Sequence, residues 1–277
     1  MPQPPRLTDR VALMRNRQRA TGDAMFLCDV VADELHDRLT VVKKSFTEMA
    51  IVSGMPKYWG QFFPNAKAVL DEETLALDEG AHDLVVHAMG LHWANDPVGQ
   101  LIQARRALRP DGLFLGAMYG GQTLHELRAC LGQAEAELTG GLTPRVAPMA
   151  ELRDIGGLLQ RAGFALPVTD NLVQTVTYQS PLHLMRDLRA MGESNALAGR
   201  RRTMSAKSIF ARAAQIYSEN FMAEGGRIEA TFEVIFLTGW SPGPNQPQPL
   251  RPGSATARLA DALGVSETPL SVDGEPD

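Results

Sequence analysis

Short apolar runs alternate with helical patterns along most of the chain. The runs expected to form strands are 49–52, 66–70, 83–87, 113–118, 173–178 and 231–240. The patterns with helical spacing are 97–108, 122–138, 149–162, 181–191 and 203–221, with one short helix after Pro56. Short apolar strands that alternate with helices are typical of an α/β fold with a mostly parallel sheet.

The first 46 residues carry a different pattern. Apolar side chains recur at the four-residue spacing of an amphipathic helix at Leu27, Val31, Leu35 and Leu39. Ahead of them, residues 6–19 hold five arginines and one acid, Asp9, and either Thr8 or Asp9 could cap a helix. Two interpretations stay open. The arginines lie in solvent on a second helix, or they form a mobile basic lid that attracts an acidic substrate or carrier.

We expect three segments. Residues 1–46 form an N-terminal helical cap, 47–241 form the α/β domain, and 242–277 form a linker and tail. Five prolines between 241 and 252 predict an extended linker. The residues from Val265 onward carry four acids and no basic residue, which predicts a mobile acidic tail.

Composition restricts the class of protein. The net charge of −5 disfavours a nucleic-acid binder, which should carry a basic face. Cys28 and Cys130 cannot build a disulfide framework or a four-thiolate metal site, so they indicate reduced intracellular thiols. The N-terminus lacks the apolar run of a secretory signal, and no apolar run approaches the ~20 residues of a membrane span. We therefore expect a cytoplasmic protein.

Several common catalytic motifs are incomplete or absent in the sequence. His125-Glu126 begins a zinc-helix pattern, but Ala129 stands where the second histidine should be. Gly239–Gly243 matches the spacing of a nucleophile elbow, yet it leads into prolines rather than a helix. Neither a phosphate-binding P-loop nor the Gly-x-Gly-x-x-Gly dinucleotide fingerprint occurs, and the histidines and cysteines show no metal-ligand spacing.

Polar residues and a glycine follow three consecutive predicted strands. They are Ser53 and Gly54 after the first, Asp71 and Glu72 after the second, and the segment from His87 to Leu91, His92 and Trp93 at the third. Ligands of doubly wound sheets bind beyond the carboxyl ends of the strands. A carboxylate there could bind a ribose or an adenine amine. Each residue also has an ordinary explanation: a turn glycine, a helix-capping aspartate, a core tryptophan. Together they favour a nucleotide-like ligand.

Longer stretches carry a family resemblance. They are His82–His87, Leu91–Asp96, Ala107–Gly116, Gly120–Arg128, Gly140–Arg145, Leu159–Phe164 and Arg186–Asn195. From Leu7 to about Gly264 the chain resembles class I S-adenosylmethionine-dependent methyltransferases. The most similar group contains the malonyl-carrier-protein methyltransferase of biotin synthesis and mitochondrial complex I assembly factor 5, with the stronger resemblance to the assembly-factor branch. The resemblance implies a Rossmann-like sheet with an antiparallel last strand, here 231–240.

The resemblance also implies S-adenosylmethionine as cofactor. By position, Asp71 matches the acid near the adenine, and His87 to Trp93 match the segment that lines the methionine. The cofactor-binding candidates are Ser53, Gly54, Asp71, Glu72, His87, Leu91 and Trp93. His87 and His92 are the candidates for a general base, if the methyl acceptor must lose a proton. His92 could equally be a structural residue beside Trp93.

One region departs from the family. After the first strand the family has an acid and a glycine-rich loop, whereas here Ile51 replaces the acid, Gly54 remains and Met55 follows. Ser53 and Asp71 are 18 positions apart, so the second strand with its ribose-binding carboxylate is expected to be missing. Charged hydrogen bonds contribute about 1.5–3 kcal/mol, so the loss would weaken cofactor binding roughly ten- to a hundredfold.

Three functions follow from these features. The first is S-adenosylmethionine-dependent methyl transfer to an unknown small-molecule or protein acceptor. The second is a catalytically degenerate methyltransferase fold that serves as an assembly or interaction factor for a subunit of respiratory complex I. The third is arginine hydroxylation, an activity ascribed to the assembly-factor branch. It would need iron or another oxidant, and the sequence offers no convincing two-His-one-carboxylate set.

Overall fold

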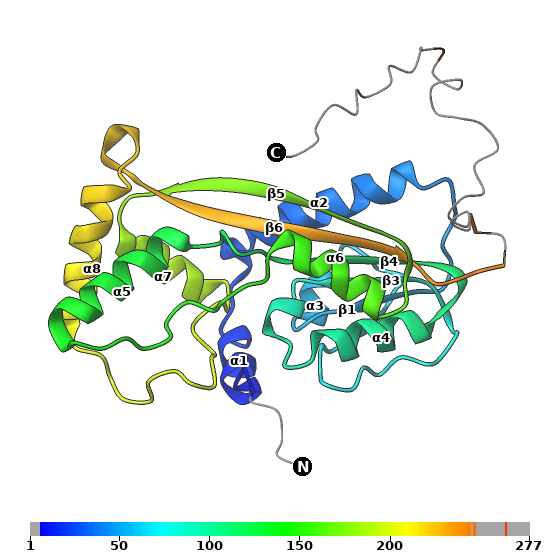
Figure 1. Cartoon of the computed structure of the whole chain (residues 1–277), viewed down its shortest axis with the longest axis horizontal. Helices are drawn as coiled ribbons and strands as arrows, with labels where there is room; N and C mark the ends of the chain where they lie inside the picture. Colours follow the sequence, from blue (N-terminus) through cyan, green and yellow to red (C-terminus); the bar gives the residue numbers. More distant parts are fainter. Residues whose placement is uncertain (1–5, 245, 248–263, 265–277) are drawn as a thin grey trace, which may run out of the picture. The chain divides into compact units, whose positions relative to one another are not determined.

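The computed structural model describes residues 6–244, 246, 247 and 264 (Figure 1). The described strands are β1 (Met49–Val52), β2 (Lys67–Val69), β3 (His82–Ala88), β4 (Leu108–Tyr119), β5 (Ala165–Tyr178) and β6 (Ile228–Trp240). The described α-helices are α1 (Arg10–Arg17), α2 (Phe26–Val41), α3 (Pro56–Trp59), α4 (Pro97–Ala107), α5 (His125–Thr139), α6 (Leu152–Arg161), α7 (Pro181–Ala190) and α8 (Lys207–Asn220). Short 3-10 helices cover Gly22–Ala24, Leu91–Trp93 and Glu224–Gly226.

The strands form one mixed sheet in the order β2-β1-β3-β4-β6-β5. β1 pairs in parallel with both β2 and β3, and β3 pairs in parallel with β4. β6 runs antiparallel to both β4 and β5. This confirms the expected Rossmann-like α/β fold with an antiparallel last strand. The strand order reverses at β1, so the carboxyl ends of β1, β2 and β3 meet where such sheets bind ligands.

Local sequence signals explain several element boundaries. Asp9 caps α1, since its Oδ1 accepts a hydrogen bond from the Ala12 amide at 3.1 Å. α4 begins with Pro97 in its first turn, after the capping Asp96. Gly163, just beyond α6, has a φ of +83°, which glycine adopts without steric cost. These three predictions from the sequence are confirmed.

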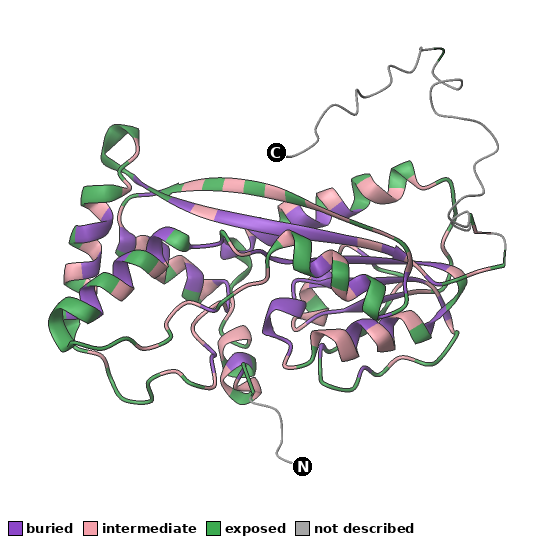
Figure 2. Cartoon of the chain, in the orientation of Figure 1, coloured by how far each residue is buried: buried purple, intermediate pink, exposed green. Residues whose placement is uncertain are grey.

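β4 and β5 begin well before their predicted first residues. β5 begins at Ala165 rather than at 173, because it is an edge strand whose side chains alternate between half-buried and exposed (Figure 2). A half-exposed strand carries no continuous apolar run, and Pro167 is tolerated at an edge. β4 begins at Leu108 and so includes the turn predicted at 109–112. At that place the pairing of β4 with β3 shifts register, since Leu108 pairs with His82 and Leu113 pairs with Leu84.

Helices cover both faces of the sheet. One core joins α2, α5, α7 and α8 to the strand face that carries Ile51, Leu84 and Val86. The second core joins α4 and α6 to the face that carries Ala50 and Val85. Arg105 ties α4 to the end of α6, because its Nε donates to the Ala162 carbonyl at 2.8 Å.

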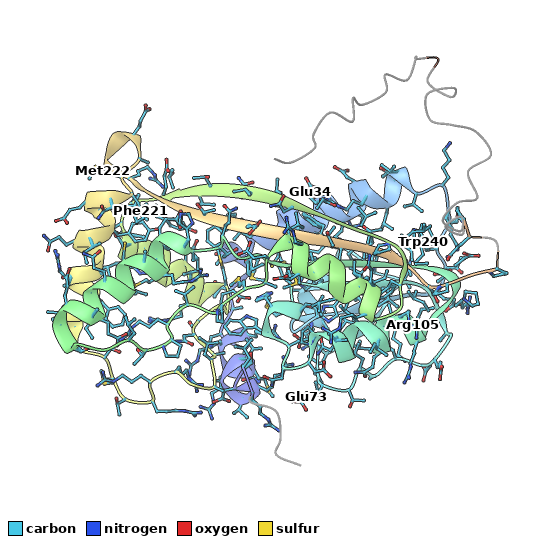
Figure 3. All side chains as sticks on the ribbon, viewed as in Figure 1. Glu34, Glu73, Arg105, Phe221, Met222 and Trp240 are labelled. Carbon is cyan, nitrogen blue, oxygen red and sulfur yellow. The ribbon has the colours of Figure 1, made fainter. Side chains whose placement is uncertain are left out.

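The long β5–β6 pair carries different helices at its two ends. Phe221 at the end of α8 and Trp240 at the end of β6 lie at opposite ends of this pair (Figure 3). α5, α7 and α8 gather at the Phe221 end (Figure 1).

The contacts divide the chain into Met1–Gly243 and Pro244–Asp277. The expected cap at 1–46 and α/β domain at 47–241 both fall inside the first unit, and the boundary between them stays a prediction. The expected linker and acidic tail lie largely outside the described residues. Within the described part of the chain, no helix combines the length and apolar character that a membrane crossing needs.

Candidate functional site

The predicted site residues gather at the carboxyl ends of three neighbouring strands. Ser53 and Gly54 follow β1, Asp71 follows β2, and His87 lies near the end of β3. Ser53 is buried, and its Oγ accepts a hydrogen bond from the Met55 amide at 3.2 Å. We call this group of strand ends the strand-end crevice. The sequence prediction thus placed the candidates at one edge of the sheet, although their function stays a prediction.

Two arginines from α1 bind the carboxylate of this crevice. Arg17 Nη1 lies 2.9 Å from both Oδ1 and Oδ2 of Asp71. Arg10 Nη2 donates to Asp71 Oδ1 at 2.9 Å and to the Asp71 carbonyl at 2.6 Å. Burial raises the pKa of the Asp71 carboxyl, but the charges of Arg17 and Arg10 outweigh burial and hold that pKa below its usual range. The carboxylate is therefore ionised and already paired.

The Arg17 side chain also covers Gly54. A Cβ at position 54 would lie 1.7 Å from Arg17 Nη1 and 2.0 Å from its Cζ. A glycine after the first strand normally lets a ligand approach the backbone. Here the guanidinium takes that space, and the Arg17 side chain is 7% exposed.

These contacts decide whether the crevice fits S-adenosylmethionine. A cofactor here needs a free carboxylate and bare backbone after β1. Asp71 is occupied by two guanidinium groups, and the Gly54 backbone lies under one of them. Met55, the next residue, lacks the bare backbone of a glycine-rich loop. In this arrangement the residues do not fit the cofactor.

α1 is anchored where it delivers these arginines. Asp9 pairs with Arg200 at 2.9 Å, and the Asp9 amide donates to the Ala196 carbonyl. Asn16 Nδ2 donates to the Ser194 carbonyl at 2.8 Å. Leu13 is buried against Trp93 and its neighbours. The prediction of a helix whose arginines lie in solvent is thus wrong for Arg17, because residues 193–200 hold the helix over the crevice.

His87 lies in a buried polar network beneath the crevice. It is fully buried, and its Nε2 lies 2.9 Å from Gln100 Oε1. The Gln100 amide nitrogen donates to the carbonyls of Asp71 and Glu72, so its oxygen can only accept, and His87 Nε2 carries the hydrogen. Burial lowers the pKa of His87 to about 4. The imidazole is therefore neutral and orients Gln100 rather than facing a ligand.

The remaining candidates lie along the segment after β3 or beside it. Leu91 packs in the second core, and the Glu72 side chain is exposed. Trp93 Nε1 donates to Glu193 Oε2 at 2.7 Å. His92 Nε2 lies 3.5 Å from the same oxygen, and the His92 ring packs against Tyr119. The structure therefore places His92 and Trp93 beside Glu193. His87 is instead connected to Asp71 through Gln100.

Glu193 is a functional candidate that sequence reasoning missed. Burial raises the pKa of its carboxyl, but the neighbouring His92 and Trp93 and the charge of Arg17 outweigh burial, so the pKa lies below its usual range. Glu193 falls inside the conspicuous stretch Arg186–Asn195, and that stretch was the available signal. No group of three or more histidine, cysteine or acidic residues suited to a metal ion occurs among the described residues.

The chain is similar to a known protein family and to several known proteins. The family described as "Methyltransferase domain" matches residues 30–116. Arginine-hydroxylase NDUFAF5, mitochondrial, of Danio rerio is 41% identical over 204 residues, which are 74% of this chain and 63% of the relative. Malonyl-[acyl-carrier protein] O-methyltransferase of Laribacter hongkongensis is 37% identical over 184 residues, which are 66% of this chain and 59% of the relative. These matches support a class I methyltransferase family for the chain.

The NDUFAF5 relatives support a methyltransferase-like protein of the NDUFAF5 branch. The human NDUFAF5 protein is 39% identical over 198 residues, covering 72% of this chain and 57% of the relative. The chain thus spans about three-fifths of the length of the curated relatives it matches. Among solved structures, a putative methyltransferase from Bacillus halodurans has a TM-score of 0.48 at 13% identity, covering 76% of this chain and 98% of the other.

The expected location is corrected by these relatives. Composition predicts a cytoplasmic protein, whereas the NDUFAF5 relatives are named as mitochondrial. The prediction is wrong because two unpaired thiols and an average composition separate secreted proteins from intracellular ones. They carry no information that distinguishes one intracellular compartment from another.

Proposed function

We propose that this chain is an assembly or interaction factor for respiratory complex I, and that it works on a methyltransferase fold without S-adenosylmethionine. The observation that carries the proposal is the position of Arg17, against Gly54 and on the Asp71 carboxylate. The partner class follows from the family branch. The compartment is the one in which that complex is assembled, which the relatives' names give as mitochondrial.

The energetics of the strand-end crevice support this proposal. A cofactor that used Asp71 would have to displace Arg10 and Arg17 from a carboxylate whose side chain is 2% exposed. Breaking a buried ion pair and leaving one charge unpaired costs about 3–5 kcal/mol. At about 1.4 kcal/mol per decade, the affinity falls roughly a hundredfold or more. The same ion pairs hold α1 against the sheet, so they stabilise the fold.

A second candidate is S-adenosylmethionine-dependent methyl transfer to a small-molecule or protein acceptor. It is favoured by open space on both sides of the Arg17 side chain. A hollow of about 490 Å³ lies on the Tyr58 side, and another of about 460 Å³ lies on the Arg10 and Glu72 side. In this alternative the arginines swing aside, and the seven cofactor-binding candidates and the bases His87 and His92 act as the family resemblance implies.

Ligand titration separates the two candidates. The full chain is titrated with S-adenosylmethionine and S-adenosylhomocysteine by calorimetry, with thermal shift as a second readout. The proposal predicts neither heat nor stabilisation up to about 1 mM ligand. Binding of wild-type chain at micromolar concentration would overturn it. The Arg17→Ala variant tests whether the Arg17 guanidinium is the group that blocks the strand-end crevice. Arg15→Ala is the matched control, because Arg15 is an exposed arginine on the same helix.

The assembly role needs its own measurement. Cells that lack the chain are expected to contain less assembled complex I on native gels, and expression of the wild-type chain should restore it. The tagged chain should also capture a complex I subunit. Unchanged complex I in cells that lack the chain would contradict the assembly role, whatever the outcome of the cofactor titration.

A further inference from the structure

The outer edge of β5 has no strand beside it. β5 is the last strand of the sheet, and β6 is its one strand neighbour among the described residues. Its pairing with β6 is continuous from Val168 to Tyr178, and its side chains mostly alternate between half-buried and exposed (Figure 2). Every second residue of an edge strand directs its backbone N–H and C=O outward. β5 therefore presents a regular row of backbone groups to which another strand could bind.

The middle of this edge lacks the features that normally prevent edge strands from pairing. Natural edges are blocked by short length, charges, prolines or bulges. In β5 the proline, Pro167, and the register shift both lie at the beginning of the strand. Residues 171–177 contain no charge, no proline and no glycine, and they are rich in valine and threonine. The Val173 side chain is 49% exposed. This composition favours pairing with a further strand.

Two arginines mark the ends of this free segment. Before it, Asp170 forms an ion pair with Arg38 of α2. At its end, Arg227 Nη2 donates to the Thr177 carbonyl at 2.6 Å, and Arg227 Nε donates to Thr177 Oγ1 at 2.9 Å. In the part of the chain that the structure describes, no other side chain bonds to the backbone of the segment between these arginines. The accessible edge is thus 171–177, and we call it the β5 edge segment.

The β5 edge segment is complementary to itself. Two copies can pair in the antiparallel direction about a two-fold axis at Gln174. Leu172 then lies opposite Val176 of the second copy, and Val173 lies opposite Thr175. Leu172 and Val176 both pack against the first core, so this pair would extend it. Val173 and Thr175 are both exposed and β-branched, and such cross-strand pairs stabilise a sheet.

The charges also favour a second copy over a charged partner. Each copy carries a net charge of −5, so a symmetric interface is stable only where it brings few like charges together. The β5 edge segment brings none. Asp170, the nearest charge, falls opposite Tyr178 of the second copy and is already paired with Arg38. A partner selected by its charge would find no complementary charge along the segment, whereas a second copy supplies matching apolar and β-branched side chains.

We propose that the β5 edge segment pairs with the same segment of a second copy of this chain, so that the two sheets become continuous across the dimer. The contact is confined to one strand segment from each copy, which places it among small, transient interfaces. The inference goes beyond the proposed function, because it concerns the opposite side of the sheet from the strand-end crevice. It holds whether or not that crevice binds S-adenosylmethionine.

The association is measured on the full chain without any substitution. Sedimentation velocity from about 2 to 200 µM should show a monomer at the low end and a dimer at the high end, as expected for a transient interface. A monomer throughout this range would overturn the proposal. Hydrogen exchange at the two ends of the range then locates the contact. Amides within 171–177 should exchange at least about threefold more slowly in the dimer. A dimer that leaves their exchange unchanged would also overturn the proposal.

Charged variants test the register of the pairing. Thr175→Lys or Val173→Glu places like charges of the two copies near each other across the axis, so each variant alone should dimerise at least about tenfold more weakly than wild type. In a mixture of the two, position 173 of one copy faces position 175 of the other, so the opposite charges should restore a mixed dimer. Thr74→Lys is the matched control, because Thr74 is exposed in the loop after β2, the strand at the opposite edge of the sheet.

The variants give two outcomes that would contradict the proposal. One is a dimer of either single variant that is as tight as that of wild type. The other is a mixture in which the two variants associate no better than each does alone. Circular dichroism establishes that each variant is folded. If one of them fails to fold, the hydrogen-exchange comparison on wild-type chain still decides whether β5 is the contact.

Discussion

The guanidinium of Arg17 lies directly on the α-carbon of Gly54, so that a Cβ at position 54 would be 1.7 Å from Arg17 Nη1. Gly54 follows the first strand of the sheet, and Arg17 is the last residue of α1. The contact closes the crevice with a group from the same chain. Each of the two residues is held in place by a different part of the structure. Arg17 is held by its ion pair with Asp71, and Gly54 belongs to the turn between β1 and α3.

Gly54→Ala should therefore destabilise the fold. The added methyl group must push Arg17 off Asp71 or move the turn after β1. Loss of this buried pair predicts a decrease of about 3 kcal/mol or more in the free energy of unfolding, measured by chemical denaturation. Gly22→Ala is the control, because no atom lies within 4 Å of a Cβ built there. Its effect should stay within about 1 kcal/mol.

A double variant tests whether Arg17 is the cause. Once Arg17→Ala has removed the guanidinium, Gly54→Ala meets no obstacle and should cost much less than it does alone. The expected coupling between the two sites is about 0.5–3 kcal/mol. Strictly additive losses would show that the two residues do not compete for the same space.

Asp71→Asn should destabilise the chain by about 3–5 kcal/mol, because it leaves Arg10 and Arg17 without their counter-charge. The folded-state pKa of Asp71 lies below its unfolded value, so its contribution is complete above that value, near 3.9, and is lost as the pH falls through the folded pKa. The difference between wild type and variant should thus narrow below about pH 4. Glu72→Gln, next in the chain and exposed, should show neither effect.

The sequence predicted where the strand-end crevice lies, but it did not predict that the Arg17 side chain occupies it. Apolar runs that stop at Ser53 and at Asp71 mark strand ends, and parallel strands bring those ends together by geometry alone. The pairing of Arg17 with Asp71 joins residues 54 positions apart, and such a contact leaves no periodic trace in one sequence. Residues 6–19 were visible as an arginine run, but the run does not say which arginine turns inward.

The contacts of Glu193 and Gln100 likewise could not be predicted from the sequence. Gln100 lies on α4 at a position that helical spacing marks as buried, yet nothing in the sequence says that it connects His87 to Asp71. Glu193 lies in a loop after α7, and its position beside Trp93 depends on how α1 and residues 193–200 pack. Local patterns predict elements, whereas these polar contacts depend on tertiary packing.

Glu135→Gln should loosen the loop that follows α5. Glu135 accepts hydrogen bonds from the Thr143 amide and from Arg145, which fixes 140–145 against the helix. We expect a loss of about 1.5–3 kcal/mol in unfolding free energy at neutral pH, as for hydrogen bonds to a charged group. Glu137→Gln on the same helix, which removes an exposed pair with Arg212, should change stability little.

The pH dependence of this effect has a definite sign. The Arg145 hydrogen bond lowers the pKa of Glu135, burial opposes it and Thr143 adds to it, and the resulting pKa is about 2. The stabilisation is complete above the unfolded value near 4.3 and is lost as the pH falls through the folded pKa. Thermal unfolding of wild type and variant should therefore converge on acidification. A constant difference down to pH 2 would contradict the pairing.

His87 should not titrate near neutral pH. Burial lowers its pKa to about 4, so the unfolded chain, with a value near 6.5, binds more protons between these limits, and stability falls as the pH drops through that window. The measurement is the His87 Hε1 chemical shift from about pH 8 to 5.5, assigned with a His87→Gln variant, and it should stay flat. A midpoint near 7 would contradict the buried contact with Gln100. It would also restore His87 as a general base for the methyltransferase alternative, because a base works best when its pKa is close to the operating pH.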